Sequence, residues 1–298
     1  MSEFTSITVQ SVLFHTPPEA LYRSLESLDR ASQLAQGAGE HGVVHVAYGD
    51  CSPSPTFSGG ELDELVQRFP GIGRVSYQYF GENLGHGGAQ NRLATSAETE
   101  LMVTANPDVI VSRRTLGLLT KVLDDPTVGV AEAKQLPLEH PKDYDELTGA
   151  TSWASGAFSM FRVREFLEIG GFDHSSFFMY GDDVDLSWRY RHRGYRVIFQ
   201  PAAAVFHDKR LGPDGEWLAS GTERYFSAES ALFLAYKWSR DDVLERLLEA
   251  MTDFPDATIQ KAVATFLRRR DADDLPERLD PEGKTAEFVD GNYAVHRW

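Results

Sequence analysis

Cysteine is nearly absent from this chain of 298 residues, in which Cys51 is the single example. This scarcity excludes an intramolecular disulfide and a cysteine-rich metal site, and it favours a reducing compartment. The first residues, Met-Ser-Glu-Phe-Thr, lack the basic and apolar regions of a signal peptide. No apolar run approaches the ~18 residues of a transmembrane helix. We therefore expect a cytoplasmic protein without a transmembrane segment, for which peripheral attachment to a membrane stays open.

Positive charge is also scarce. The 29 Lys and Arg residues are outnumbered by 45 Asp and Glu, which gives a formal net charge of −16 at pH 7. A general nucleic-acid-binding protein needs a basic face, so we expect no nucleic-acid partner. A phosphorylated small molecule, held by a metal ion and a few arginines, remains compatible with this composition. The hydrophobic content of 42% is ordinary for a globular protein with a real core.

The first part of the chain alternates strand-like and helix-like segments. The expected strands are 7–14, 43–48, 74–80, 101–105 and 128–131, and the expected helices are 17–34, 61–69, 87–96 and 112–123. This alternation predicts an α/β fold of βαβ units, with a mostly parallel, Rossmann-like sheet flanked by helices. Ligands of such sheets bind beyond the carboxyl ends of the strands.

The pattern changes after about residue 220. Long helical stretches at 228–250 and 257–270 precede an acidic segment that contains two prolines. We predict an α/β domain at 1–220, a helical extension at 221–270 and a loosely structured tail at 271–298. The helices could pack on the body, on a second subunit or at a membrane surface, so a homo-oligomer stays open.

An acidic cluster follows the aromatic segment 177–180. Asp182, Asp183 and Asp185 fall within four positions. Carboxylates among apolar neighbours are costly unless a metal, a proton or a cation offsets them, which suggests a functional site. The structural alternative is a helix start, because acidic residues are favoured in a first turn. That helix would run to about Arg193 and stop at Gly194.

Polar residues also follow the predicted strands. Asp50 could accept hydrogen bonds from a nucleobase or a ribose, or could serve only a turn. The glycine-rich segment 82–91 lets backbone approach a ligand and offers helix N–H groups to phosphate. It lacks the third glycine of the dinucleotide fingerprint and the Gly-Lys-Ser/Thr of a P-loop.

Two further residues could bind a divalent cation. Asp108 follows the expected strand 101–105, where a carboxylate can hold a cation that bridges to a diphosphate. The alternative for Asn106-Pro107-Asp108 is a proline turn before a helix. His207 follows the β-like run 195–199, and its expected place near acidic residues at strand ends favours a metal role over a structural one.

Taken in order, these motifs resemble family 2 glycosyltransferases with a GT-A fold, and among them the bacterial rhamnosyltransferases and galactofuranosyltransferases. The resemblance spans roughly residues 7–207, and the C-terminal helices carry little of it. Its motifs are Asp50 with Ser52, Asn83-Leu84-Gly85 with Gly87, Gly88 and Asn91, Asn106-Pro107-Asp108, Gly170-Gly171-Phe172-Asp173, Asp182-Asp183-Val184-Asp185-Leu186, and His207.

The resemblance implies inverting transfer of a sugar from a nucleoside diphosphate donor. The donor would be linked to dTDP or UDP, with a sugar such as rhamnose or galactofuranose. The acceptor would be a hydroxyl of a carbohydrate or glycolipid, in the synthesis of cell-surface glycans. The fold it implies is a GT-A domain with a helical C-terminal extension.

The resemblance also implies roles for individual residues. Asp183 matches the catalytic base, beside Asp182, which replaces a more usual Glu. Asp108 and His207 would hold Mn²⁺ or Mg²⁺, although Asn106 replaces the first Asp of the metal motif. Asp50, Asn83, Gly85, Gly87, Gly88, Asn91 and Asn106 would line the nucleotide pocket, and Trp153, Ser155 and Gly156 would face the donor sugar and the acceptor. Because the helix start lowers the pKa of Asp183 and its acidic neighbours raise it, we expect the three carboxylates to titrate as a coupled set.

Two other functions are compatible with an α/β nucleotide site. A non-catalytic sugar-nucleotide-binding or scaffold protein on the same fold is suggested by Asn106 in the metal motif. A nucleotidyltransferase would need a basic, glycine-rich loop near the first strand, and segment 13–17 offers none.

Overall fold

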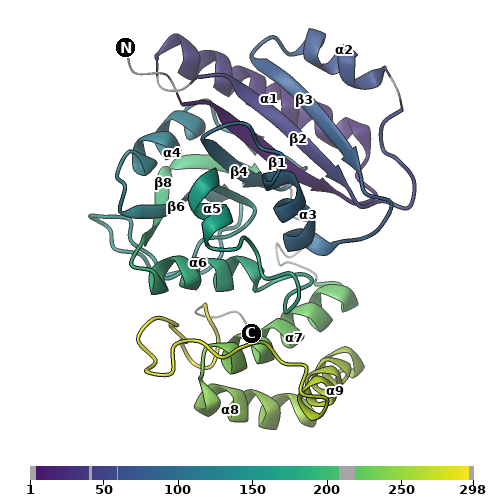
Figure 1. Ribbon diagram of the computed structural model, residues 1–298, viewed down its shortest axis with the longest axis vertical. Helices are drawn as coiled ribbons and strands as arrows, with labels where there is room; N and C mark the ends of the chain where they lie inside the picture. The colour runs from purple at the N-terminus through teal and green to yellow at the C-terminus, as the bar shows by residue number, and fades with distance from the viewer. Residues whose placement is uncertain (1–4, 40–41, 59, 208–218, 295–298) are drawn as a thin grey trace.

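A central sheet with helices on its faces forms the body of the protein, and a layer of helices lies beneath it (Figure 1). The computed structural model describes residues 5–39, 42–58, 60–207 and 219–294. The strands of the sheet follow the order β3-β2-β1-β4-β7-β6-β8-β5. Their bounds are β1 Ile7–Leu13, β2 Val44–Asp50, β3 Ile72–Tyr79, β4 Leu101–Ala105, β5 Val109–Val111, β6 Val128–Leu136, β7 Phe158–Arg162 and β8 Arg196–His207.

The direction of the strands brings several carboxyl ends to one edge of the sheet. Strands β3, β2, β1 and β4 pair in parallel, and so do β6 and β8. Strand β7 lies antiparallel between β4 and β6, so β6 and β8 point the same way as β4. The prediction of a mostly parallel α/β sheet is therefore confirmed. The sequence analysis missed β5 and β7, which are short and run against the other strands.

The helices of the body agree closely with the expected segments, except for the short α5, which the sequence analysis missed. Helix α1 buries Leu21, Leu25 and Leu28 against the sheet, as the spacing of these apolar residues predicts. Strand β6 continues five residues beyond its expected end at 131, and β8 reaches His207. The helix bounds are α1 Pro18–Gly37, α2 Glu61–Arg68, α3 Gly85–Ala94, α4 Thr115–Leu123, α5 Val163–Glu168 and α6 Asp182–His192.

The helical layer packs on α6 through an apolar core of its own. Trp188 of α6 meets Trp238 edge to face, with ring centroids 5.5 Å apart, and both rings are fully buried. The expected single helix at 228–250 is wrong, because the chain breaks at Ser239, which has a φ of 56°. The layer contains α7 Gly221–Lys237, α8 Asp241–Thr252 and α9 Ala257–Asp271.

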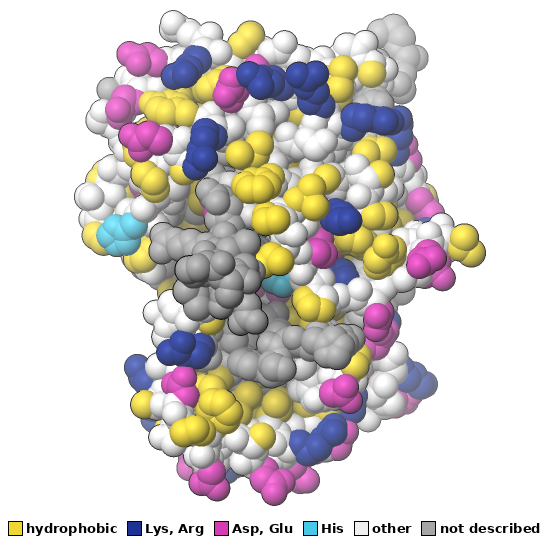
Figure 2. Space-filling view, turned by 180° about the vertical axis from the view of Figure 1, so that it is seen from behind, with side chains coloured by type: hydrophobic (Ala, Val, Ile, Leu, Met, Phe, Trp, Pro, Cys, Tyr) yellow, Lys and Arg dark blue, Asp and Glu magenta, His cyan; other side chains and the backbone are white. Residues whose placement is uncertain are grey.

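The acidic segment after α9 contains turns and one isolated bridge among its described residues. Parts of it are nevertheless packed, since Ala286 and Tyr293 belong to the core of the helical layer. The opposite side of the molecule carries Lys and Arg side chains across its upper part, with Asp and Glu among them and further acidic side chains at the lower end (Figure 2). Of the helices in the described ranges, none is both long and apolar enough to cross a membrane.

Two glycines allow a direct test of how α3 meets the segment before α6. Gly85 has a φ of +69°, and a Cβ there would lie 2.4 Å from the carbonyl oxygen of Phe178. Gly170 has a φ of +94° with nothing within 4 Å of its Cβ position. Gly170→Ala should cost only backbone strain, roughly 1–3 kcal/mol. Gly85→Ala adds a clash with backbone, so it should lower the free energy of unfolding in urea by more. Equal losses would contradict this close packing.

Candidate active site

The acidic cluster begins helix α6, as the structural interpretation of the sequence predicts. Gly181 precedes the helix with a φ of 71°, and Asp182, Asp183 and Asp185 lie in the first turn. Carboxylates there face the positive end of the helix dipole. The helix ends at His192, and Gly194 follows with a φ of 88°, so the predicted stop is confirmed.

Within this turn, Asp185 serves to join parts of the structure. It is fully buried, and its Oδ2 accepts a hydrogen bond of 2.8 Å from Nε of Arg189. Its Oδ1 lies 2.8 Å from Nζ of Lys237 and 3.1 Å from Nε1 of Trp238. Asp185 therefore anchors α6 to the helical layer.

Asp182 is paired with a histidine that the sequence analysis did not select. Its side chain is almost fully buried, and Oδ2 lies 2.6 Å from Nδ1 of His86 on α3. Burial alone would lower the pKa of His86, but the charge of Asp182, with a contribution from Asp183, raises this pKa above its ordinary value. Asp182 therefore links α6 to α3. Its role beside the catalytic base stays a prediction.

Asp183 is less buried than these two neighbours. Its Oδ2 accepts a hydrogen bond of 3.0 Å from the backbone N–H of Gly156, and its Oδ1 accepts one of 2.9 Å from Val184. His86 lies against Asp182, and Lys237 lies against Asp185. That the three carboxylates titrate as a coupled set stays a prediction.

Glycines allow α3 to lie close to Phe172, His174 and the segment before β7. A Cβ at Gly87 would lie 2.7 Å from Cβ of Phe172, and one at Gly156 would lie 2.9 Å from Cε1 of His86. Gly88 packs in the same way against His174. One feature of the sequence could have pointed to a close contact of His86: the residues next to it at the start of the helix are glycines.

Two asparagines of this segment order the backbone. Oδ1 of Asn83 accepts a hydrogen bond of 3.1 Å from the N–H of Gly85, where α3 begins. The side chain of Asn91 binds both backbone polar groups of Phe172. Its Oδ1 accepts a hydrogen bond from the Phe172 N–H, and its Nδ2 donates one to the Phe172 carbonyl, each at 2.8 Å. Asn91 therefore fixes the loop before Asp173 to α3, and its place in the wall of a nucleotide pocket stays a prediction.

Asp50 ends β2 as a fully buried carboxylate. It accepts hydrogen bonds of 2.8 Å from the N–H of Ser52, 2.8 Å from the N–H of Thr56 and 2.6 Å from the hydroxyl of Tyr77. Burial opposes its ionisation, but these hydrogen bonds outweigh it and hold the pKa of Asp50 below its ordinary value. The turn interpretation is confirmed, and the contact with a nucleobase stays a prediction.

Asp108 and His207 lie together at the same edge of the sheet. Nε2 of His207 is 3.5 Å from Oδ1 of Asp108 and 3.1 Å from Nδ2 of Asn106. Nδ1 is 2.9 Å from Oε1 of Gln135, an oxygen that can only accept, so Nδ1 carries a proton and Nε2 presents a lone pair when the imidazole is neutral. A histidine that binds a metal through Nε2 has this arrangement.

The protein ligands for a metal at this position are few. Within the described ranges, no group of three or more His, Cys, Asp and Glu side chains could hold an ion. One carboxylate and one imidazole nevertheless fit a divalent cation that takes its other ligands from substrate phosphates and water. The residues present are therefore compatible with such an ion, and Gln135 is a supporting residue that the sequence analysis missed.

The segment before β7 lies between these two groups. Its Gly156 donates to Asp183, and the carbonyl of Ala157 accepts a hydrogen bond of 2.9 Å from the N–H of Asn106. Trp153 and Ser155, expected to face the substrates, are 2% and 3% exposed and point into the protein. Gly156 is the member of this trio that lies beside the acidic turn.

A buried ion pair holds this segment from behind. Glu132 of β6 pairs with Lys142, and its Oε1 accepts a hydrogen bond of 2.9 Å from the N–H of Ser155. Nζ of Lys142 lies 4.1 Å from the centre of the Trp153 ring. Burial raises the pKa of Glu132 to about 7, although the charge of Lys142 opposes this. Glu132 stands alone among apolar residues of β6, and this could have indicated a buried acid that needs a partner.

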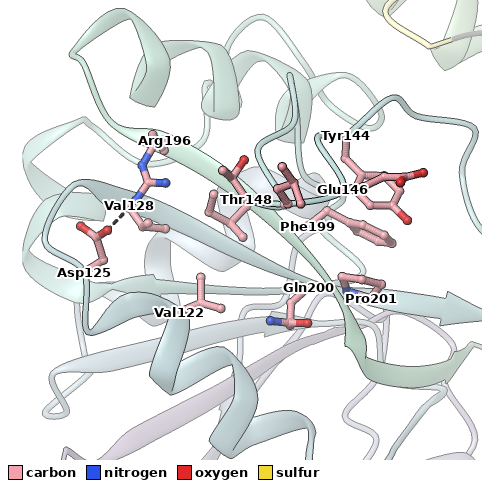
Figure 3. A pocket seen from close by; sticks show the side chains of 13 residues that line it. Val122, Asp125, Val128, Tyr144, Glu146, Thr148, Arg196, Phe199, Gln200 and Pro201 are labelled. Carbon is pink, nitrogen blue, oxygen red and sulfur yellow. Dashed lines mark hydrogen bonds and ion pairs between the residues drawn. The ribbon is translucent and has the colours of Figure 1, made fainter.

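A separate cavity of about 300 Å³ lies at the other ends of β6 and β8 (Figure 3). Val128 and Arg196, the first residues of these strands, line it together with Tyr144 and Phe199. Arg196 forms an ion pair with Asp125 there. Because none of the predicted site residues lines it, this cavity is distinct from the candidate site.

The pairing of His86 with Asp182 can be tested by an NMR titration of the imidazole. His86 should titrate above 6.5, its ordinary pKa. Asp182→Asn should bring this pKa below 6.5, because burial remains while the attraction is lost. The folded pKa is raised, so the pair stabilises the protein fully below pH 6.5 and the effect is lost as pH rises through the folded pKa. Glu82→Gln, which changes an exposed acid, is the control, and an unaltered His86 pKa in Asp182→Asn would contradict the pairing.

Comparison with known sequences gives distant relatives of one kind. No protein-family model matches this chain. Rhamnosyltransferase WbbL of Escherichia coli K12 is 23% identical over 215 residues, which cover 57% of this chain and 79% of that protein. An N-acetylglucosaminyl-diphospho-decaprenol L-rhamnosyltransferase of Mycobacterium tuberculosis is 27% identical over 197 residues, which cover 50% of this chain and 63% of that enzyme. The chain thus spans slightly less than two thirds of the mycobacterial protein.

Solved structures show the same fold at low sequence identity. The mannosyltransferase PcManGT of Pyrobaculum calidifontis, in complex with GDP-Man and Mn²⁺, superposes with a TM-score of 0.60 and 18% identity over 91% of this chain and 76% of its own. GalNAc-T7 with UDP, GalNAc and Mn²⁺ gives a TM-score of 0.62 and 14% identity over 92% of this chain and 55% of its own. The resemblance predicted from the ordered motifs is confirmed: the chain has the GT-A glycosyltransferase fold, and its sequence is similar to those of bacterial rhamnosyltransferases.

Proposed function

We propose that this protein is an inverting, metal-dependent glycosyltransferase that moves a sugar from a nucleoside diphosphate to an acceptor hydroxyl. One observation carries the proposal. Asp183 and the pair Asp108–His207 lie on either side of the short segment Gly156–Ala157, which is hydrogen-bonded to Asp183 and to Asn106. A base and a cation site separated by one backbone segment suit a displacement in which a proton leaves on one side and a diphosphate on the other.

Asp183 is the residue proposed to act as the base. As the acceptor oxygen bonds to the anomeric carbon, the bond from that carbon to the diphosphate breaks, and the acceptor proton passes to Asp183. Attack opposite the leaving group inverts the configuration. The N–H groups of Gly156 and Val184 orient the carboxylate. The ionised carboxylate is the form that accepts the proton.

Asp108 and His207 are the residues proposed to hold the cation, Mn²⁺ or Mg²⁺. A bound cation supplies electrostatic stabilisation of the negative charge on the departing diphosphate. Gln135 keeps the imidazole in the tautomer whose Nε2 faces Asp108. Mixed imidazole and carboxylate donors suit Mn²⁺ at least as well as Mg²⁺. Mn²⁺ in the structures of PcManGT and GalNAc-T7 supports this assignment.

The names of the relatives favour rhamnose as the sugar. We infer a dTDP-linked donor, with UDP-galactofuranose as the alternative. The mycobacterial relative is named for a lipid-linked diphospho-sugar acceptor, which supports a glycolipid acceptor here and glycan synthesis at the inner face of a membrane. The division into a catalytic part at 1–220, a helical extension and a tail belongs to the same proposal.

A non-catalytic sugar-nucleotide-binding protein is the second candidate. It is favoured by Asn106, whose amide lies 3.1 Å from the nitrogen of His207 that would bind the metal. Metal-dependent donor binding without transfer to any acceptor would select it.

Replacement of the proposed base tests the catalytic proposal. Asp183→Asn should lower the rate of sugar transfer by about 10²–10⁴-fold, the range typical of general base catalysis. Donor affinity, measured by calorimetry, should change little, because the base acts on the acceptor. Asp253→Asn, an exposed acid of the helical layer, is the matched control. Near-normal turnover by Asp183→Asn would show that the base is another group.

The cation site is tested by thermal unfolding with UDP-, dTDP- and GDP-sugars, each with and without Mn²⁺. A donor that binds the native state raises the midpoint, and the shift grows with the logarithm of donor concentration over its dissociation constant. Mn²⁺ should increase this shift in the wild type and in Asp124→Ala, an exposed control. Asp108→Ala and His207→Ala should each remove the Mn²⁺-dependent part. An undiminished Mn²⁺ effect in both variants would refute the assignment.

A further inference from the structure

The first turn of α6 is held from the helical layer by a buried lysine. Nζ of Lys237, near the end of α7, lies 2.8 Å from Oδ1 of Asp185 and 2.7 Å from Oδ2 of Asp173. The lysine side chain is 7% exposed. Burial opposes ionisation of Asp173, but the charge of Lys237 and the hydrogen bonds from Lys237, Ser175 and Ser176 together hold the pKa of this carboxyl well below its ordinary range. One ammonium group thus joins α7 to α6 and to the loop that precedes it.

Helix α7 also forms hydrogen bonds with the backbone that leads into α6. Oγ of Ser230 lies 2.7 Å from the carbonyl oxygen of Tyr180 and 3.1 Å from that of Met179. The hydroxyl of Tyr180 is 3.1 Å from Oε1 of Glu223, at the start of α7. Tyr180 and Gly181 have φ values of 63° and 71°, a left-handed turn that a non-glycine residue adopts only when its surroundings hold it.

The contacts of α7 continue towards the glycine-rich helix. Arg189, the other cation on Asp185, donates hydrogen bonds to the carbonyls of Ile169 and Gly171. The next residue, Phe172, is the one that Asn91 of α3 holds at both backbone polar atoms. The acidic turn, the 169–173 loop and α3 are therefore connected to α7 through polar contacts.

We propose that α7 positions the active site, and that Lys237 is the positioning residue through which it sets the place of Asp183. This inference rests on the proposed function, because it concerns the base of that reaction. Asp183 lies two residues before Asp185 in the same helical turn. A shift of Asp185 therefore moves the Asp183 carboxylate away from the Gly156 N–H that orients it.

Apolar packing alone would not require a charge at this position. Leu232, Phe233 and Leu234 already bury the apolar surface of α7. A buried ammonium group is costly unless its partners are placed well, so it favours one position of α6 over others. A methionine at residue 237 would fill a similar volume without this requirement.

The test compares Lys237→Met with Lys237→Arg and with Lys261→Met, an exposed lysine of α9. Lys237→Met should lower kcat by at least about tenfold, as expected for a small misplacement of a catalytic group. The KM for the donor should change by less than about threefold, because the donor diphosphate would be held through Asp108 and His207, which lie outside the Lys237 ion pairs. Lys237→Arg should recover part of kcat, and Lys261→Met should match the wild type. A folded Lys237→Met with wild-type kcat would overturn the proposal.

Two further measurements keep the test decisive. If Lys237→Met does not fold, Ser230→Ala removes hydrogen bonds to the Tyr180 and Met179 carbonyls without leaving a charge unpaired, and it should lower kcat with donor KM retained. If the wild type transfers no sugar, the proposed function fails, and hydrogen exchange then tests the positioning by itself. Exchange of the Asp185 amide, bonded to the Gly181 carbonyl at 2.9 Å, should be faster in Lys237→Met or Ser230→Ala than in Lys261→Met. Unchanged exchange would overturn the positioning role.

Discussion

The buried carboxylates at the start of α6 need nearby cations or hydrogen-bond donors to offset the cost of burying their charge. His86 of α3 lies against Asp182, and Lys237 and Trp238 of the helical layer lie against Asp185. Each partner belongs to a different segment of the chain. Because an uncompensated buried charge is costly, these segments must dock together for the turn to form. The middle carboxylate, Asp183, is instead oriented by backbone N–H groups and is less buried.

A second constraint comes from the sheet. Strand β7 runs against its neighbours, which leaves the segment before it at the same edge as the carboxyl ends of β4, β6 and β8. This segment contains Gly156, and the strand ends contribute Gln135 and His207 and lead into Asp108. The proposed base and the proposed cation ligands therefore share one short piece of backbone. The Glu132–Lys142 pair holds that piece from the interior, through Ser155 and Trp153.

Local regularities in the sequence were sufficient to predict the α/β class, most helices and strands of the body, and the start and stop of α6. Apolar spacing and helix-terminal residues act over a few positions, so they can be recognised without tertiary information. The short strands β5 and β7, the short helix α5 and the break at Ser239 were missed. Their conformations depend on pairing with β8 and β4 and on packing in the helical layer, which are contacts between distant positions.

The sequence by itself determined the kinds of groups that meet at the strand ends and their order along the chain, because side-chain chemistry and spacing are local properties. Only the tertiary structure decided which of these groups already have partners. Asp182, Asn91 and Trp153 were predicted as site residues from their place in the sequence, and the structure shows that the side chains of Asp182 and Asn91 have partners and that Trp153 is buried. His86, Glu132 and Lys237 drew no attention, because a single charged residue in a sequence does not reveal its partner. The physical reason is the same in each case: the cost of burying a charge or an amide depends on which partners the fold brings within hydrogen-bonding distance.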